Sequence, residues 1–463
     1  MIIMKFGGTS LQDAEAVSRA LQAVETRIPE RPCVVLSAMG KTTNKLLEVA
    51  RRAHRGDVQE ARQICLELGE HHSAVARDLL TGERLAETDR KLRGYFEEIS
   101  NTIQGVYLLG ECTPRSQDAI IAFGERMSSL VFSQALAEQG HPAALLDSRD
   151  LICTDDDFTR AAVFEELSFS RIREEVTPRM KTGEVAVLQG FIGSTKEGIT
   201  TTIGRGGSDY TASLIGAALE VRDVQIWTDV PGILTADPCI VAHVYKIKSI
   251  SFHEASELAY FGAKVLHPST LLPAISRNIP VHVCDSSRID KPGTLISADT
   301  IPSKTPVKSV ACKKGITLLN IYSTRMLLAY GFLRGIFDVF DRHKTVVDVV
   351  ATSEVSVSLS IDSTTNLEPL VKDLQVFGKV DVEPNVAIIC VVGDNLRSTP
   401  GIPSRIFNSV ETINVLMISQ GASHINVTFI VEEDKMKDCV CRLHEEFFAQ
   451  PDPDLFEAVE IKN

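Results

Sequence analysis

The chain has 463 residues, 44% of them hydrophobic and 24% charged, which is the composition of a soluble globular protein with room for about two to four domains. Its formal net charge of −13 argues against nucleic acid and anionic membranes as main partners, so an anionic substrate needs a local basic pocket. No apolar run approaches the roughly 18 residues of a membrane span. The start, Met1–Lys5, leads directly into a strand without a signal or transit peptide, and the scattered cysteines are typical of reduced thiols, so we predict a cytoplasmic protein.

The cysteines and histidines show no metal-ligand spacing. Only Cys439 and Cys441 lie close together, and alternating residues on a strand or loop make a poor zinc clip. The sequence therefore predicts no metal site built by the protein.

Alternating strands and helices are predicted along residues 1–297. A strand at Ile2–Phe6 runs into a glycine turn and a helix from about residue 13 to 27, where Ser10 and Asp13 approximate a capping box. The next strand, Cys33–Ser37, precedes a helix from about residue 44 to 54, and further strands are predicted at 185–189, 224–228 and 280–283. This alternation predicts an α/β fold with a mostly parallel sheet covered by helices on both faces.

The most informative stretch is residues 200–212, where a threonine-rich strand meets a glycine turn and a helix that we expect from Tyr210 to Leu219. Glycine exposes backbone to a ligand, the start of a helix favours an anion, and Ser208 or Asp209 can cap it. Arg205 adds a planar fork for a carboxylate or phosphate. An ordinary strand–helix corner is the alternative, but three glycines with an embedded Arg and Asp favour an anion site.

The composition changes near residues 298–310, which we predict to be a linker. After it, a strand–helix–strand–strand order occurs twice, at about residues 311–383 and 384–463, and an alternative is that the C-terminal segment completes the first copy. This pattern predicts two small α+β modules.

Five motifs in this sequence, taken in order, resemble those of a known family. They are Lys5–Ser10, Gly124–Glu125, Gly204–Asp209, Trp227–Gly232 and Gly262–Pro268. Over essentially the whole chain, their order resembles the aspartate kinases, closest to the single-function, lysine-sensitive branch. The resemblance implies an amino-acid kinase fold followed by two ferredoxin-like ACT modules. It also implies ATP-dependent phosphorylation of the β-carboxylate of L-aspartate, with Mg²⁺, as the first step toward lysine, threonine and methionine.

The resemblance also implies roles for individual residues. Catalytic residues are Lys5, Asp209 and Lys264, with Asp209 orienting Lys5. Substrate-binding residues are Thr43, Glu125, Arg205, Gly206, Gly207 and Ser208, with Glu125 on the ammonium group and Arg205 on the α-carboxylate. Nucleotide-binding positions are Lys5, Phe6, Gly7, Gly8, Thr228, Asp229, Leu234, Cys239, Lys264 and Val265, and the amides of Gly7 and Gly8 cradle phosphate oxygens. At Leu234 and Cys239, close relatives carry tyrosine and arginine.

An effector site in the first ACT module is implied in the same way. Its positions are Met326, Ala329, Gly331, Phe332, Leu333, Asp348, Thr352, Ser353 and Glu354, with Asp348 pairing the effector's ammonium group. We predict feedback inhibition by lysine. Ala329 stands where the lysine-sensitive branch has serine, so threonine is the alternative effector. Pairing of ACT sheets between chains predicts a homodimer or homotetramer.

Two other functions remain open at this point. Kinases of the same fold that act on glutamate or N-acetylglutamate lack the ACT pair. A catalytically inactive amino-acid sensor would use only the ACT modules, but intact Lys5, Glu125, Arg205 and Lys264 speak against it.

Overall fold

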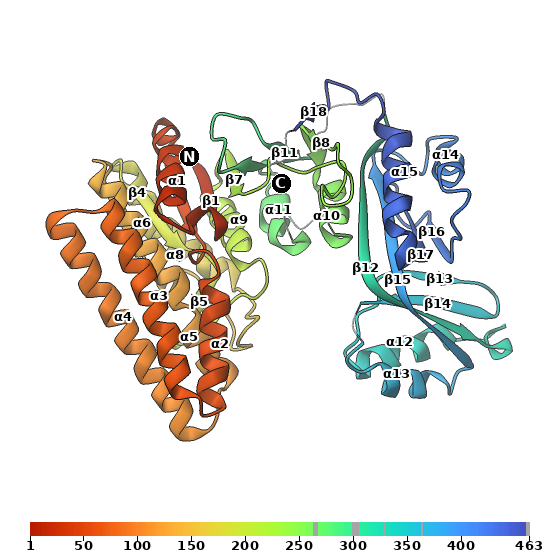
Figure 1. Cartoon of the computed structure of the whole chain (residues 1–463), viewed down its shortest axis with the longest axis horizontal. Coiled ribbons are helices and arrows are strands. Elements are labelled where there is room, and N and C mark those ends of the chain that lie inside the picture. The colour runs from red at the N-terminus through yellow and green to blue at the C-terminus, as the bar shows by residue number, and fades with distance from the viewer. Residues whose placement is uncertain (263–266, 299–304, 328, 363, 460–463) are drawn as a thin grey trace. The chain divides into compact units, whose positions relative to one another are not determined.

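The computed structural model describes residues 1–262, 267–298, 305–327, 329–362 and 364–459. The chain divides into two compact units, each of which is described by itself (Figure 1). The first comprises Met1–Ile233, Lys248–Phe252 and Val265–Thr300, and the second comprises Leu234–Ile247, His253–Lys264 and Ile301–Asn463. None of the described helices is long and apolar enough to cross a membrane.

The first unit is built on an eight-stranded sheet with the order β3-β4-β2-β1-β7-β10-β11-β9. The strands are β1 (Ile2–Phe6), β2 (Pro32–Leu36), β3 (Ala143–Leu146), β4 (Val185–Gln189), β7 (Asp223–Thr228), β9 (Ser249–Ser251), β10 (Val281–Asp285) and β11 (Thr294–Ser297). The run from β3 to β10 is parallel, and only the β10–β11 pair is antiparallel. All five residues of β1 are buried, as expected for a central parallel strand covered on both faces. The predicted mostly parallel sheet is thus confirmed.

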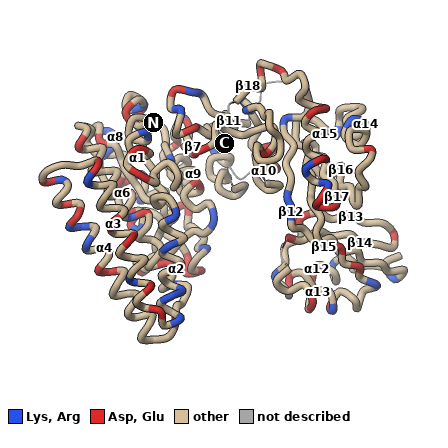
Figure 2. The backbone as a smooth tube through the Cα atoms, in the orientation of Figure 1, with Lys and Arg blue, Asp and Glu red and all other residues tan. Residues whose placement is uncertain are grey.

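Helices of the first unit connect and cover these strands. They are α1 (Ala14–Glu25), α2 (Thr42–His54), α3 (Val58–Leu79), α4 (Gly82–Leu109), α5 (Pro114–Ile121), α6 (Phe123–Glu138), α7 (Ser148–Leu151), α8 (Glu165–Lys181), α9 (Gly207–Leu219) and α11 (Leu272–Ser276). The long helices α3 and α4 pack along each other beside α2 (Figure 1). Basic and acidic residues are interspersed along α3 and α4, as Figure 2 shows, so these helices present a solvated surface of mixed sign.

Two predicted helix caps are wrong. Asp13, not Ser10, caps α1, because its carboxylate accepts the N–H of Ala16 at 2.8 Å. Ser10 lies in a 3₁₀ turn (Thr9–Leu11) and donates to the hydroxyl of Ser286 at 2.8 Å. Helix α9 begins at Gly207, three residues before the predicted start, and has no side-chain cap. Its first turn, which carries no capping side chain, lines the pocket described below.

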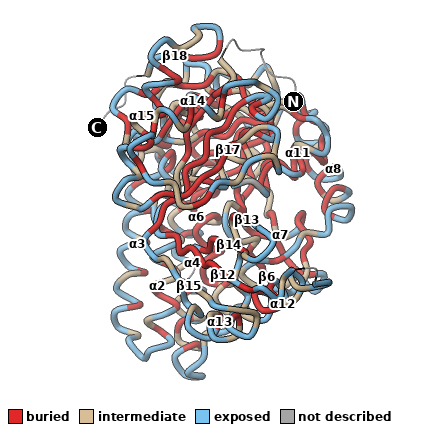
Figure 3. The backbone as a smooth tube through the Cα atoms, turned by 90° about the vertical axis from the view of Figure 1, so that its right-hand side faces the viewer, coloured by how far each residue is buried: buried red, intermediate tan, exposed pale blue. Residues whose placement is uncertain are grey.

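The second unit holds a six-stranded antiparallel sheet with the order β13-β14-β12-β15-β17-β16. The strands are β12 (Val307–Tyr322), β13 (Val350–Thr352), β14 (Ser356–Ile361), β15 (Lys379–Gly393), β16 (Met417–Gln420) and β17 (Asn426–Glu432). The helices are α12 (Phe332–Arg342), α13 (Leu367–Leu374), α14 (Ile402–Ser409) and α15 (Met436–Phe448), and Figure 1 shows them as two pairs at opposite ends of the sheet. Strands such as β17 are buried beneath exposed helices and loops (Figure 3).

The repeat predicted from the sequence is present, but the two copies share one sheet. Strands β12 and β15, 16 and 15 residues long, pair along most of their length and contribute to both halves. The sequence pattern missed α13 and α15. The predicted linker 298–310 is also too long, because β12 starts at Val307 and Lys308 is buried.

Segments predicted to belong to the first domain pack on this sheet instead. Glu254, on α10 (Phe252–Tyr260), forms an ion pair of 2.9 Å with Lys308, and both side chains are almost fully buried. Strand β8 (Tyr245–Ile247) pairs with β18 (Phe456–Ala458). The compact units thus alternate along the chain, whereas the predicted domain ranges are contiguous.

Candidate active site

A pocket of about 430 Å³ opens in the first unit where α9 begins. Its lining includes nine residues that the sequence marked for catalysis or binding, namely Lys5, Gly8, Thr43, Glu125, Arg205, Gly206, Gly207, Ser208 and Asp209. They come from β1 and the turn after it, from α2 and α6, and from the start of α9 and the turn before it, which are far apart in the sequence. The fold therefore brings together every residue predicted to bind the substrate and two of the three predicted catalytic residues.

Lys5 and Asp209 form a close ion pair in this pocket. The Lys5 Nζ lies 2.6 Å from an Asp209 carboxylate oxygen, and both side chains are about nine-tenths buried. Lys5 is on the central strand β1, and Asp209 is in the first turn of α9, where the helix dipole favours a carboxylate. The pair fixes the ammonium group of Lys5 at the pocket wall.

Glu125 is a buried carboxylate that forms no ion pair with the residues the structure describes. It lies in the first turn of α6 with 3% of its surface exposed, and its Oε1 accepts the N–H of Ala38 at 3.2 Å. Its Oε2 is buried and has no hydrogen-bond partner among the described residues. Burial raises the pKa of Glu125 to about 8, while the Ala38 N–H and the charge of Lys5 act against this shift. Such a group gains most from a ligand that brings a positive charge.

The turn that carries Arg205 depends on glycine. Gly206 has φ +74°, and a Cβ there would lie 2.6 Å from a methyl carbon of Thr270. The turn therefore tolerates only glycine at this position. Arg205 itself is exposed at the pocket, and among the described residues its guanidinium has no ion pair. The arginine is thus available to an anionic ligand.

The glycine turn after β1, formed by Gly7 and Gly8, agrees only in part with the prediction that both amides bind phosphate. The Gly7 N–H donates to the carbonyl of Trp227 at 3.0 Å, so this amide is already used, and the prediction that it binds phosphate is corrected. A Cβ on Gly8 would lie 2.8 Å from the Gly40 carbonyl oxygen, which explains glycine there. The Phe6 side chain is fully buried and stacks on Trp227, so only its backbone can face a ligand.

Residues assigned to the nucleotide belong to different parts of the chain. Thr228 ends β7 and donates to Asp229 at 3.1 Å, next to the end of β1. Leu234 and the exposed Cys239 belong to the second unit. Lys264 and Val265 lie outside the described residues.

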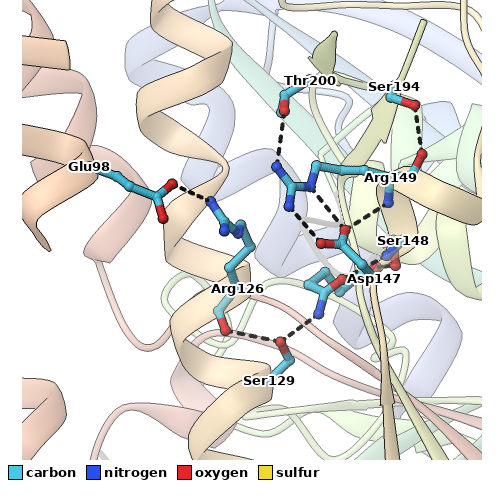
Figure 4. A network of polar contacts seen from close by, with 9 residues as sticks. Glu98, Arg126, Ser129, Asp147, Ser148, Arg149, Ser194 and Thr200 are labelled. Carbon is cyan, nitrogen blue, oxygen red and sulfur yellow. Dashed lines mark hydrogen bonds and ion pairs between the residues drawn. The ribbon is translucent and has the colours of Figure 1, made fainter. Parts of the chain in front are cut away.

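A polar network anchors α6, the helix that carries Glu125 (Figure 4). Ser129, one turn after Glu125, accepts from the side chain of Gln189 at 2.8 Å. Gln189, at the end of β4, also accepts the N–H of Ser148 at 2.8 Å. Next to it, Arg149 is held by Asp147 at 2.6 Å. The end of the sheet therefore fixes the position of Glu125.

The predicted effector residues lie in the second unit around α12 and β13. Gly331 precedes α12 with φ +76°, and Met326 and Phe332 pack on the hydrophobic core beside this helix. Leu333 and Ala329 are exposed, as are the residues that follow from the end of β13, Thr352–Glu354.

Asp348 is already engaged in the structure. Its Oδ1 accepts from the Tyr260 hydroxyl at 2.6 Å and lies 3.1 Å from the Lys313 Nζ, and its side chain is 2% exposed. Its Oδ2 is buried without a hydrogen-bond partner among the described residues. The predicted pairing with an effector ammonium group would thus have to share or replace these contacts.

Several pocket residues were not predicted. Gln117, Thr159 and Phe191 line it, and the buried Asp118 lies directly behind it. The one available signal was the spacing of Asp118 three residues before Ile121, which places an acidic side chain on the apolar face of α5. Across the described ranges, no three His, Cys, Asp or Glu side chains are grouped to hold a metal ion.

Comparison with known proteins agrees with this geometry. Residues 1–285 match the amino acid kinase family, and residues 389–447 match the ACT domain. The chain is 38% identical to aspartokinase 2, chloroplastic, of Arabidopsis thaliana, over 97% of this chain and 85% of the relative. It is 36% identical to the lysine-sensitive aspartokinase 3 of Escherichia coli (strain K12), over 97% and 99%.

Solved structures give the same answer. E. coli aspartokinase III in complex with aspartate and ADP (R-state) matches with a TM-score of 0.84 at 35% identity, over 97% of this chain and all of the other. The complex of the same enzyme with lysine and aspartate (T-state) matches with a TM-score of 0.80 at 35% identity, over 97% and 99%. The chain therefore belongs to the amino acid kinase family and, within it, is an aspartate kinase with an ACT domain.

Proposed function

We propose that the pocket at the start of α9 binds L-aspartate and that the β-carboxylate is phosphorylated beside Lys5, yielding 4-phospho-L-aspartate. The observation that carries this proposal is the buried Oε2 of Glu125, which lacks a hydrogen-bond partner among the described residues, in the same pocket as the exposed Arg205. An α-amino acid carries one ammonium and one carboxylate group, and these two side chains match them in sign. The complex of E. coli aspartokinase III with aspartate and ADP supports the choice of substrate.

Each polar group of aspartate has a candidate partner in the pocket. We assign the ammonium group to Glu125 and the α-carboxylate to Arg205, whose guanidinium offers a bidentate fork. The hydroxyl groups of Thr43 and Ser208 and the glycine backbone at 206–207 line the same space and complete the polar surface. The β-carboxylate is then left for Lys5.

Phosphoryl transfer requires positioning and neutralisation of charge rather than a general base, because a carboxylate nucleophile is already ionised at pH 7. Lys5, oriented by Asp209, supplies a fixed positive charge beside the reacting oxygen. When bound, ATP with Mg²⁺ supplies the phosphoryl group and part of the neutralising charge. We propose that Mg²⁺ enters with the nucleotide, because Mg²⁺ at such sites is bound largely by substrate phosphates.

We assign the nucleotide phosphates to the Gly8 turn, where the amides of Gly8 and Thr9 have no acceptor among the described residues, whereas those of Ser10 and Leu11 donate to the carbonyls of Gly7 and Gly8. Gly8 fits this task, because its close contact with Gly40 excludes any larger side chain from the cradle. Thr228 and Asp229, at the end of the adjacent strand, are proposed for the ribose and base. Leu234, Cys239, Lys264 and Val265 keep the nucleotide roles that the resemblance implies.

Lysine is the proposed feedback inhibitor, bound by the residues around α12 and β13. The lysine-sensitive relative and its complex with lysine support this assignment, as does the buried carboxylate of Asp348, which lies just before β13 and whose Oδ2 has no hydrogen-bond partner among the described residues. Threonine is the alternative, because Ala329 lacks the hydroxyl of the lysine-sensitive branch. A homodimer or homotetramer in the cytoplasm, and a role in lysine, threonine and methionine synthesis, complete the proposal.

A coupled assay of ADP release tests the substrate. We expect turnover with L-aspartate and none above background with glutamate, N-acetylglutamate or no acceptor. Turnover with glutamate instead would overturn the proposal, and absence of turnover with every acceptor, together with lysine binding, would indicate a sensor. Titration with lysine and threonine at subsaturating aspartate identifies the effector, and inhibition by threonine alone at millimolar levels would overturn the lysine assignment.

A further inference from the structure

The turn that carries Arg205 leaves from a small hairpin and not from the central sheet. Strands β5 (Ile192–Ser194) and β6 (Thr200–Thr202) form a separate two-stranded sheet, and β6 ends three residues before Arg205. A hairpin of two short strands is marginally stable by itself. The position of Arg205 therefore depends on the groups that hold β6.

Asp118 holds β6 with both of its carboxylate oxygens. Its Oδ1 accepts the hydroxyl of Thr202 at 2.7 Å, and its Oδ2 accepts the N–H of Thr202 at 2.9 Å. Oδ2 also accepts the N–H of Thr159 at 2.9 Å. Asp118 is completely buried on α5, so a single side chain ties this helix to β6 and to a third segment.

Thr159 shows that this third segment needs to be held. Its φ of +74° lies in the left-handed region, which is unfavourable for a β-branched residue. Its carbonyl oxygen would lie 3.2 Å from a Cβ on Gly204, directly against the turn that leads to Arg205. Thr159, Thr202 and Gly204 all line the pocket, whereas Asp118 does not. The hydrogen bonds of Asp118 thus shape the wall of the pocket from behind.

We infer that Asp118 is a positioning residue for aspartate binding, which acts by fixing Thr159 and β6 so that Arg205 meets the substrate carboxylate. This inference rests on the proposed role of Arg205. A carboxylate suits the position because it accepts three hydrogen bonds from two segments, and charge-assisted bonds are stronger than neutral ones. Burial raises the pKa of Asp118, and the three donors from Thr159 and Thr202 oppose that rise.

The test compares KM for aspartate with KM for ATP in variants of the full chain. Asp118→Ala leaves three donors without an acceptor, and we expect KM for aspartate to rise by about tenfold or more while KM for ATP stays within about twofold. Asp118→Asn keeps one oxygen for both N–H groups and should retain most of the affinity. Thr202→Val removes only the hydroxyl bond and provides a milder variant if Asp118→Ala does not fold. Asp157→Asn, on the same loop but exposed, with its carboxylate bonded to Arg160, is the matched control and should leave both KM values unchanged.

A double-mutant cycle with Arg205→Ala separates positioning from a general structural role. If Asp118 acts through Arg205, adding Asp118→Ala to Arg205→Ala should change KM for aspartate by less than about twofold. An equal effect in both backgrounds, or a parallel rise of both KM values, would overturn the inference while the role of Arg205 stands. If Arg205→Ala alone leaves KM for aspartate unchanged, the proposed clamp itself is wrong.

Discussion

Two buried carboxylates, Glu125 in the first unit and Asp348 in the second, are both proposed to bind the ammonium group of an amino acid, yet their surroundings differ. The carboxylate of Glu125 accepts the N–H of Ala38 and forms no ion pair with any described residue, and burial raises its pKa to about 8. Asp348 already accepts from Tyr260 and pairs with Lys313.

This difference separates two kinds of competition. In the proposed function, a substrate ammonium group at Glu125 would compete with a proton, so aspartate binding would depend on pH. An effector at Asp348 would instead compete with Lys313 and with Tyr260, which ends the helix α10. Binding of such an effector would be linked to the position of that helix, which is a physical requirement for allosteric coupling. The following predictions test this comparison.

The largest effect is expected for Lys5→Ala. The charge of Lys5 lowers the pKa of Glu125, and in the proposed function Lys5 also supplies charge to the reacting carboxylate, so its loss should affect both catalysis and aspartate binding. We expect kcat to fall by about 10²-fold or more, the range found when one preorganised donor is removed. Steady-state assays at saturating substrates measure it, and Lys45→Ala on the exposed face of α2 is the control. Retention of more than about a tenth of the activity, less than ~1.4 kcal/mol, would exclude the proposed role.

Glu125→Gln should raise KM for aspartate by on the order of 30-fold or more, because removal of one partner of a buried charge pair costs about 2–5 kcal/mol. KM for ATP should change little, and Glu98→Gln, which is largely exposed, serves as control. In the parent enzyme, kcat/KM for aspartate should rise as the pH increases toward about 8, where Glu125 loses its proton, and this dependence should disappear in the variant. An unchanged pH profile would argue against Glu125 as the ammonium partner.

Glu125→Gln should also change how the thermal stability of the protein depends on pH. Because the pKa of Glu125 is raised to about 8 in the folded state, the protonated carboxyl stabilises the fold at low pH, and this contribution is lost as the pH rises to about 8. Without aspartate, Tm of the parent enzyme should therefore fall relative to Glu125→Gln between pH 6 and pH 9. Thermal unfolding at these pH values measures it.

Asp348→Ala should weaken inhibition by lysine by about tenfold or more while uninhibited turnover stays near that of the parent enzyme, since coupling energies are typically 1–3 kcal/mol. The Lys313 Nζ also lies 3.1 Å from the Asp362 Oδ2, so Lys313 still has an anionic partner after the substitution. The half-inhibitory lysine concentration measures the effect, and Asp381→Ala, at a partly exposed position on β15, is the control. Undiminished inhibition would place the effector elsewhere.

The smallest effect is expected for Tyr260→Phe, which should strengthen inhibition by lysine, whereas Asp348→Ala should weaken it. Burial and the bond to Asp348 raise the pKa of Tyr260, so its hydroxyl remains a donor throughout the usable pH range. Loss of this competing donor, worth about 0.5–1.5 kcal/mol, should lower the half-inhibitory lysine concentration by roughly twofold to tenfold. Tyr322→Phe, exposed on β12, is the control. Weaker inhibition in Tyr260→Phe would contradict the competition.

Part of the site could be predicted from the sequence because its residues occur in short local patterns. Glycine turns after buried strands give positions for a ligand, and β1 and β7 were found at almost the predicted bounds. The start of α9 was missed because Gly206 and Gly207 look like turn residues, although Gly207 is already helical. Phosphate binding by the Gly7 amide was also wrong, since the carbonyl that occupies it belongs to a strand 220 residues away.

The sequence by itself determined the alternation of strands and helices, the two-copy pattern of the C-terminal part and the residue types of the pocket, because hydrophobic periodicity and turn chemistry act over a few residues. Only the tertiary structure decided which charges are paired. The Glu125 oxygen without a partner in the described part of the chain, the three bonds of Asp118 and the contact of Tyr260 with Asp348 each depend on packing between segments distant in sequence. Burial and pairing set the free energy of a charge, and neither is encoded locally.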